Sequence, residues 1–239
     1  VVTIADLLSR LMPATAGVVG GVSYVMYSQP GRVVAGDLFG IDQVSDTAVT
    51  AYLGDVAGKG AGAGMLMASI QAALAMEVRG DAPPNEIVAR LNAYVAAHSS
   101  GAEFATLFLI VINHATLRAT MVDAGHGYAA LIRKGEISVL ASDGGPPVGA
   151  VDGLPYAATE IDVLPGDRIV LYSDGVAEQQ NPTGEEFGVE RAFEALRGAA
   201  NGEEDVGQLV TALRTFASSD HFADDVTLAS VSITVQACD

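Results

Sequence analysis

Apolar and polar residues alternate along several stretches of the chain, and this period of two is typical of β-strands that bury one face. The first such stretches cover residues 17–28, 32–42 and 46–57. Further strands are expected at residues 103–114, 116–127, 128–134, 136–142, 156–164, 167–176 and 225–235. Gly135-Glu136 and Pro165-Gly166 lie between neighbouring stretches and have the chemistry of tight turns.

Apolar residues three or four positions apart predict helices between the blocks of strands. A short helix is expected at Ile4–Leu11, where Met12-Pro13 ends it. The other expected helices cover Gly62–Val78, which is apolar nearly all round, and residues 85–100, 189–199 and 205–218. The acidic run Glu203-Glu204-Asp205 fits a helix N-terminus, where negative charge is favourable.

The predicted elements follow the order strands, two helices, strands, two helices, strand. Most connections between strands are short, which favours antiparallel pairing. A strictly alternating βαβ pattern is absent, which argues against a doubly wound sheet. The order fits an α+β fold in which two antiparallel sheets pack together with helices outside.

Composition narrows the choice of function. The chain has 239 residues, half of them apolar, and its 29 acidic and 12 basic residues give a formal net charge of −17. Such a surface repels nucleic acid and anionic lipid, and it supplies carboxylates, which hold hard divalent cations. Neither the N-terminus nor the apolar run Leu11–Gly31, which contains two prolines, predicts a signal peptide or a membrane span.

The single cysteine, Cys238, excludes a disulfide framework and a cysteine–zinc cluster within one chain. A reducing cytoplasm is the expected location. The chain begins with Val1 rather than Met, so we expect it to be a piece of a longer protein.

The glycine-rich stretch GDVAGKGAGAGM, residues 54–65, is similar to a phosphate-binding loop only at first sight. A Walker loop would need glycine at position 53 and a hydroxyl at position 60, where the chain has Leu53 and Gly60. A dinucleotide fingerprint would need a surrounding βαβ unit, which the predicted order lacks. The glycines are better explained as positions where the backbone approaches a site closely.

Aspartates at or near the ends of predicted strands are the main candidates for chemistry. They are Asp37, Asp55, Asp174 and the pair Asp224-Asp225. Any one of them alone has an ordinary explanation as a turn residue. As a set they would converge at one rim of the sheets, where a divalent cation such as Mg²⁺ or Mn²⁺ would relieve their mutual repulsion.

A series of motifs in the same order carries a family resemblance. They are AGDLFG, GDVAGKGAGAGMLMA, FATLFLIVI, DAGHGYAALIRKGE, GGPPVGA, GDRIVLYSDGVAEQQNPTGEEFG and ADDVTLASV. The chain resembles the PPM-type (protein phosphatase 2C-like) serine/threonine phosphatases, in particular the SpoIIE/RsbU branch. The resemblance implies an α-β-β-α sandwich with a two-metal centre. It also implies one phosphatase domain over residues 31–239, with residues 1–30 as an N-terminal helix and first strand leading into it.

The resemblance also implies the metal ligands. They would be the carboxylates of Asp37, Asp55, Asp174 and Asp224 and the carbonyl of Val56, with Asp55 bridging two Mn²⁺ or Mg²⁺ ions. The choice between Asp224 and Asp225 stays open at this stage.

The chain departs from the family pattern at two positions. Gly40 stands where many members have a second aspartate, and Asp123 stands where the family has asparagine. The expected ligand set is nevertheless complete.

The implied reaction uses no side-chain nucleophile. Water activated by the two metals would attack the phosphorus of phosphoserine or phosphothreonine, with Asp55, Asp37 and Asp174 acting as catalytic residues through the metals. His126 could supply a proton to the leaving group or, as we favour, stabilise a loop. Lys59 could attract phosphate or be a solvated loop residue. Arg32 could meet the substrate, although this role is the weaker one.

Relatives in this branch imply a regulatory substrate, a phosphorylated STAS-domain anti-sigma-factor antagonist, and the resemblance allows sensor or receiver domains in the same polypeptide and a homodimer. A non-catalytic scaffold of the same fold is the alternative. A carboxylate-based nuclease is a third candidate, and the strong negative charge argues against it and against nucleic acid as a partner.

Overall fold

The computed structural model describes residues 7–31, 35–58, 60–80, 82–99 and 103–234. The chain forms two compact units, each built from three segments of sequence. Unit 1 comprises Val1–Pro13, Val34–Gly127 and Ala141–Val163, and unit 2 comprises Ala14–Val33, Tyr128–Leu140 and Leu164–Asp239. The predicted division at residue 30 is not tested by this arrangement and stays a prediction.

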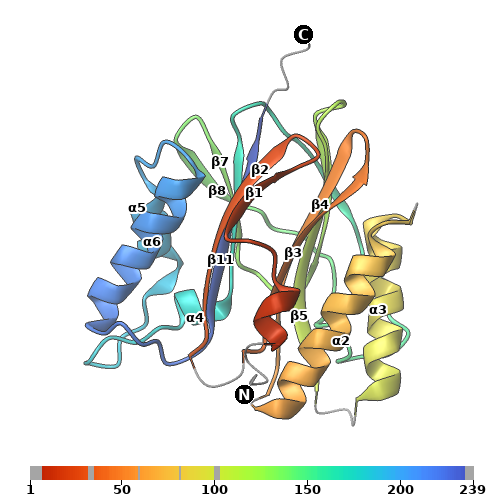
Figure 1. Ribbon diagram of the computed structural model, residues 1–239, viewed down its shortest axis with the longest axis horizontal. Coiled ribbons are helices and arrows are strands. Elements are labelled where there is room, and N and C mark those ends of the chain that lie inside the picture. Colours follow the sequence, from red (N-terminus) through yellow and green to blue (C-terminus); the bar gives the residue numbers. More distant parts are fainter. Residues whose placement is uncertain (1–6, 32–34, 59, 81, 100–102, 235–239) are drawn as a thin grey trace. The chain divides into compact units, whose positions relative to one another are not determined.

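Unit 1 contains a five-stranded antiparallel sheet in the order β3-β4-β5-β6-β9. The strands are β3 (Asp37–Ser45), β4 (Ala48–Val56), β5 (Ala105–Asn113), β6 (Arg118–Ala124) and β9 (Thr159–Asp162). Helices α2 (Ala61–Glu77) and α3 (Pro84–His98) cover one face of this sheet (Figure 1). The predicted N-terminal helix is helical throughout its described part: Leu7 and Leu8 are α-helical, and the 3₁₀ helix η1 (Ser9–Leu11) follows them.

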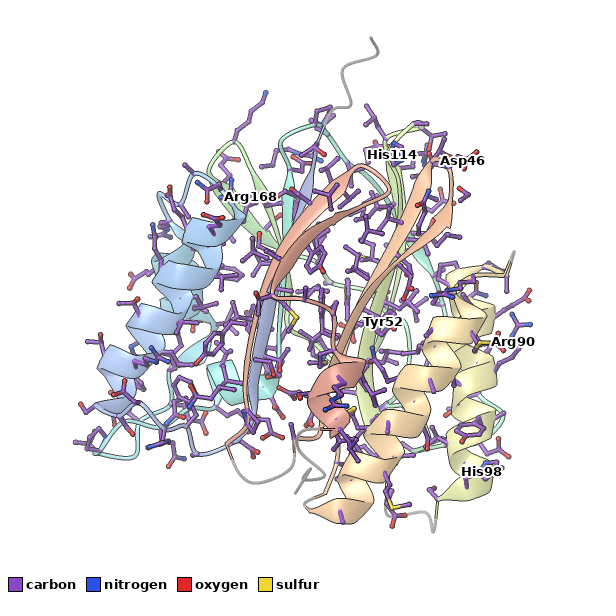
Figure 2. All side chains as sticks on the ribbon, in the orientation of Figure 1. Asp46, Tyr52, Arg90, His98, His114 and Arg168 are labelled. Atoms are coloured by element: carbon purple, nitrogen blue, oxygen red, sulfur yellow. The ribbon has the colours of Figure 1, made fainter. Side chains whose placement is uncertain are left out.

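The core of unit 1 lies between this sheet and its two helices. Tyr52 on β4 is fully buried there, and its hydroxyl accepts a hydrogen bond from Gln71 of α2 at 3.4 Å (Figure 2). A Cβ atom at Gly40 would lie 2.1 Å from the Tyr52 ring, so a side chain at that position would force the buried Tyr52 ring to move. The departure from the family pattern at Gly40 is therefore explained by the space that Tyr52 occupies.

Unit 2 contains a six-stranded antiparallel sheet in the order β1-β2-β11-β10-β7-β8. The strands are β1 (Ala16–Val19), β2 (Val22–Gln29), β7 (Ala129–Arg133), β8 (Glu136–Val139), β10 (Arg168–Tyr172) and β11 (Val226–Ile233). Helices α5 (Gly188–Leu196) and α6 (Gly202–Ala217) lie on one face of this sheet (Figure 1). The short helix α4 (Asp174–Ala177) follows β10.

Two predicted strands differ from the structure in kind, while others, such as β3 and β9, differ in their bounds. Residues 17–28, expected as one strand, form the β1–β2 hairpin, because Gly20 and Gly21 both adopt positive φ and make a two-residue turn. The expected strand over residues 167–176 ends at Tyr172, and Asp174 begins helix α4 instead of ending a strand.

A buried ion pair joins the sheet of unit 2 to helix α6. Arg168 on β10 (labelled in Figure 2) binds the carboxylate of Asp205 with nitrogen–oxygen distances of 2.6 and 3.0 Å. The Ser230 hydroxyl also donates to Asp205, whose side chain is fully buried. Asn201 caps α6 by accepting a hydrogen bond from the Glu204 amide. The acidic run therefore lies in the first turn of a helix, as predicted. Its last residue, Asp205, forms the buried ion pair with Arg168.

None of the helices among the described residues is both long and apolar enough to cross a membrane.

The Arg168–Asp205 pair predicts an unequal cost of two arginine substitutions. Arg168→Met leaves a buried carboxylate without its charge partner and should lower the free energy of unfolding by about 3–5 kcal/mol. Arg118→Met removes an ion pair to Glu160 whose two side chains are 57 % and 63 % exposed, and should cost at most about 1 kcal/mol. Urea denaturation of both variants measures the difference, and equal losses would contradict the assigned role of Arg168.

Candidate metal centre

Asp37 and Asp55 form a pair of like charges in unit 1. Asp37 is the first residue of β3 and only 1 % exposed, and Asp55 lies directly opposite it on β4. Residues opposite each other on antiparallel strands point to the same face, and two negative charges in that arrangement repel each other. A bound cation is the ordinary way to relieve this repulsion.

Gly36 lies beside two oxygen atoms that could bind such a cation. A Cβ atom at this position would come within 2.9 Å of both the Asp55 Oδ1 atom and the Val56 carbonyl oxygen. The Val56 amide donates to the Gly36 carbonyl at 3.3 Å, which holds the two segments together. Carboxylate and carbonyl oxygens are the ligands that Mg²⁺ and Mn²⁺ prefer, so the residues of unit 1 fit these ions.

Asp174 occupies the first position of α4 in unit 2. Burial raises the pKa of its carboxyl group, and the nearby charges of Asp224 and Asp225 raise it further, while a hydrogen bond from the Gly175 amide opposes the rise. A Cβ atom at Gly175 would lie 2.0 Å from the Asp225 carbonyl oxygen. Glycine at this position therefore allows α4 to lie against the segment that carries Asp224.

Asp224 and Asp225 differ in their surroundings. The Asp225 Oδ1 atom accepts a hydrogen bond from the Gly31 amide at 2.9 Å, which ties this residue to the end of β2. The Asp224 Oδ1 atom accepts from the Asp225 amide at 3.0 Å, and Asp224 is exposed. Asp225 therefore holds two backbone segments together, whereas the Asp224 carboxylate lies at the surface of the unit.

Further acidic residues surround Asp174, and the sequence analysis did not single them out. Burial raises the pKa of Glu178, and so do the charges of Asp174, Glu186 and Asp224. Burial also raises the pKa of Tyr128, with the charges of Glu178, Asp174 and Glu186 contributing. The available signal was the spacing of Asp174 and Glu178, four residues apart across one helical turn. This part of unit 2 thus concentrates negative charge.

His126 takes part in a hydrogen-bonded group behind Asp55. Its ring Nδ1 atom lies 3.3 Å from the Thr106 Oγ1 atom, and this hydroxyl accepts from the Asp55 amide, also at 3.3 Å. The His126 amide donates to Asp123 at 2.6 Å. Burial raises the pKa of Asp123, although the amide hydrogen bonds it accepts oppose the rise. These contacts support the loop-stabilising role for His126, and Thr106 was missed by sequence reasoning.

Arg32 and Lys59, the two basic candidates, lie outside the described residues, as does Cys238.

Across the described ranges, no group of three or more His, Cys, Asp or Glu side chains is arranged to hold a metal ion. Unit 1 brings Asp37 and Asp55 together, and unit 2 brings Asp174 near Asp224. The union of the two pairs in one centre stays a prediction.

Comparison with known proteins identifies the family. The sequence profile of the family described as Stage II sporulation protein E (SpoIIE) matches residues 45–234. The chain therefore belongs to the SpoIIE family of PP2C-type phosphatase domains. It is also 29 % identical over 196 residues to Protein IcfG of Synechocystis sp., a match that covers 70 % of this chain and 31 % of IcfG. The chain thus spans about a third of the length of this relative.

Solved structures show the same fold. The SiaA-PP2C domain of Pseudomonas aeruginosa superposes with a TM-score of 0.80 at 20 % identity, over 95 % of this chain and 93 % of that domain. The phosphatase domain of SpoIIE from Bacillus subtilis, solved with a fragment of its regulatory domain, gives 0.78 at 17 % identity, over 88 % of this chain and 62 % of that one. The catalytic domain of the serine/threonine phosphatase PstP, in complex with 2 manganese ions, gives 0.65 at 21 % identity, over 88 % and 97 %.

These likenesses confirm the predicted fold class, two antiparallel sheets flanked by helices, and the predicted family. They also confirm the enzyme class, because PP2C-type serine/threonine phosphatases are metal-dependent hydrolases.

The raised pKa of Asp174 predicts how one substitution changes stability with pH. A carboxyl group whose pKa is raised on folding destabilises the folded state as the pH rises through that pKa. Metal-free Asp174→Asn should therefore be more stable than the wild type at neutral pH, and the gain should shrink as the pH falls and vanish below about pH 3, under the ordinary aspartate pKa, where the carboxyl group is protonated in both the folded and the unfolded state. Thermal melting in chelator measures this, with the exposed loop residue Asp152→Asn as control. A gain that persists or grows on acidification would contradict the account.

Proposed function

We propose that this chain hydrolyses phosphoserine or phosphothreonine with the aid of two divalent cations. The proposed ligands are the carboxylates of Asp37, Asp55, Asp174 and Asp224 and the carbonyl oxygen of Val56. The proposal requires that the carboxylates of both units meet around the same pair of ions.

The observation that carries the proposal is the cross-strand pair of Asp37 and Asp55. Repulsion between two opposed carboxylates, one of them buried, has a cost that a folded protein retains only for a purpose. A side chain at Gly36 would press on both the Asp55 Oδ1 atom and the Val56 carbonyl oxygen, so glycine at this position leaves room beside these two oxygen atoms. The acidic surroundings of Asp174 in unit 2 support the same conclusion, because burial and neighbouring charges both disfavour its charged form without a cation.

In the proposed mechanism, the carboxylates of the chain hold the cations in position, and no side chain attacks the substrate. Two divalent cations, when bound there, would lower the pKa of water and would neutralise charge on the phosphoryl group. Asp55 presents its carboxylate next to the Val56 carbonyl, so one short segment offers ligands in a fixed relation. Asp37 and Asp174 hold the negative charge that keeps the cations in place, and Asp224 adds a fourth carboxylate. Asp225 is engaged with the Gly31 amide, which supports Asp224 as the ligand of that pair.

Mn²⁺ and Mg²⁺ are the proposed ions. All proposed ligand atoms are hard oxygen atoms, which suit both ions, and the PstP structure contains manganese.

The proposed substrate is a phosphorylated STAS-domain anti-sigma-factor antagonist in a partner-switching pathway. Membership of the SpoIIE family supports a regulatory phosphoprotein over a metabolite. Sensor or receiver domains in the same polypeptide would agree with the short share of IcfG that the chain spans. Incubation with such a phosphoprotein should release inorganic phosphate in the presence of Mn²⁺. Release from small phosphate esters but from no phosphorylated STAS-domain protein would contradict this substrate.

Removal of the bridging carboxylate gives the decisive test of enzyme against scaffold. With p-nitrophenyl phosphate and Mn²⁺, Asp55→Asn should lower kcat by more than about 100-fold, since loss of even a supporting partner of a metal ligand costs 10–100-fold. Exhaustive chelation should abolish wild-type activity, and added Mn²⁺ should restore it.

Asp46→Asn, a substitution in the turn between β3 and β4 of the same sheet, serves as the control and should leave kcat within about twofold of the wild type, because surface substitutions away from a site have small effects. A wild-type protein without activity at any Mn²⁺ concentration would favour the non-catalytic scaffold.

A further inference from the structure

Three residues on neighbouring strands of unit 1 form a row that ends at Thr106. Asp37 on β3 lies opposite Asp55 on β4, and Asp55 lies opposite Thr106 on β5. Side chains paired in this way across antiparallel strands lie on the same face of the sheet. The Thr106 hydroxyl therefore stands next to the carboxylate that is proposed to bridge the metals.

The hydroxyl of Thr106 joins two hydrogen bonds. The backbone amide of Asp55 donates to the Oγ1 atom at 3.3 Å, and the Nδ1 atom of His126 lies 3.3 Å from the same oxygen. A hydroxyl can accept one hydrogen bond while it takes part in another, so it can link the backbone of Asp55 to the imidazole ring. The ring is 4 % exposed, which limits its freedom to move.

The position of His126 is in turn fixed by Asp123 at the end of β6. The Asp123 carboxylate accepts hydrogen bonds from the amides of His126 at 2.6 Å and of Gly127 at 3.0 Å. Gly125 and Gly127 both adopt positive φ, which the tight turn around His126 requires. A continuous series of contacts thus runs from Asp123 through His126 and Thr106 to the Asp55 amide.

We propose that Thr106 and His126 are positioning residues that fix the backbone amide of Asp55 and thereby the two-residue segment Asp55–Val56, which carries the Asp55 carboxylate and the Val56 carbonyl. This inference rests on the proposed function. Metal sites commonly depend on such partners, because a ligand that can move binds its ion less tightly. The same contacts assign His126 a role in placing Asp55. Asp123, which stands where the family has asparagine, supports the ring through two backbone amides.

The test measures Mn²⁺ binding to the metal-free protein by isothermal titration calorimetry. Thr106→Val keeps the shape of the side chain but removes the hydroxyl, and it should raise the Mn²⁺ dissociation constant by about tenfold or more. Thr106→Ser retains the hydroxyl and should stay within about threefold of the wild type. Thr120→Val, a half-buried threonine on β6 of the same sheet, is the matched control and should bind Mn²⁺ as the wild type does.

A parallel pair of variants keeps the inference testable if Thr106→Val does not fold. His126→Leu should weaken Mn²⁺ binding to a similar extent, and His126→Asn, which retains a polar atom at the δ position, should restore most of the affinity. The effects of Thr106→Val and His126→Leu should not add in the double variant, because both break one series of contacts.

The outcomes separate this inference from the proposed function. If Asp55→Asn abolishes Mn²⁺ binding while Thr106→Val and His126→Leu bind as the wild type does, the positioning role is wrong and the proposed function stands. Loss of affinity in Thr106→Ser equal to that in Thr106→Val would also overturn the role, because it would indicate packing and not the hydroxyl. If Asp55→Asn itself binds Mn²⁺ like the wild type, the proposed function fails.

Discussion

Asp37 and Asp55 are held directly opposite each other on neighbouring strands, and the proposed metal centre is built on this pair of carboxylates. The register of β3 and β4 places Asp37 against Asp55, and the burial of Asp37 removes the water that would screen the repulsion. Three neighbouring residues shape the surroundings of Asp55. Gly36 leaves room beside the Asp55 and Val56 oxygen atoms, and Thr106 on the neighbouring strand β5, with His126, holds the backbone amide of Asp55.

Unit 2 also brings carboxylates close together, but it uses a helix start and not a pair of opposed strand residues. Asp174 begins a short helix whose second residue is a glycine, and that glycine allows the backbone before β11 to approach closely. Burial raises the pKa of Asp174, and the nearby carboxylates of Asp224 and Asp225 raise it further, so negative charge accumulates here as well. Asp37 and Asp55 of unit 1 and Asp174 and Asp224 of unit 2 are thus the four carboxylates that the proposal requires.

Much of the fold was predictable from the sequence, because strand and helix periods are local properties. Helix α2 was expected at Gly62–Val78 and lies at Ala61–Glu77. The β1–β2 hairpin was missed although Gly20-Gly21 is a recognised turn signal, because the flanking residues continue the alternation. The start of α4 at Asp174 could not be told from a strand end, since four residues are too few for a helical period.

The sequence predicts which residues belong to the candidate site, but it does not predict how those residues are arranged. Strand ends and family motifs single out the aspartates, but the register that makes Asp37 face Asp55 depends on the irregularity between Gln43 and Ser45. Thr106 carries no signal of its own, because its role follows from lying opposite Asp55 across 51 positions of sequence. The role of such a supporting residue depends on strand pairing between distant parts of the sequence, so local patterns do not reveal it.

Crystals grown with Mn²⁺ and measured at the manganese absorption edge would show whether one pair of ions joins the four aspartates. Two anomalous peaks are expected within bonding distance of the Asp55 carboxylate, with Asp37, Asp174 and Asp224 completing the two coordination spheres. A single ion held by one unit alone, or no peak beside Asp55, would contradict the proposed metal centre.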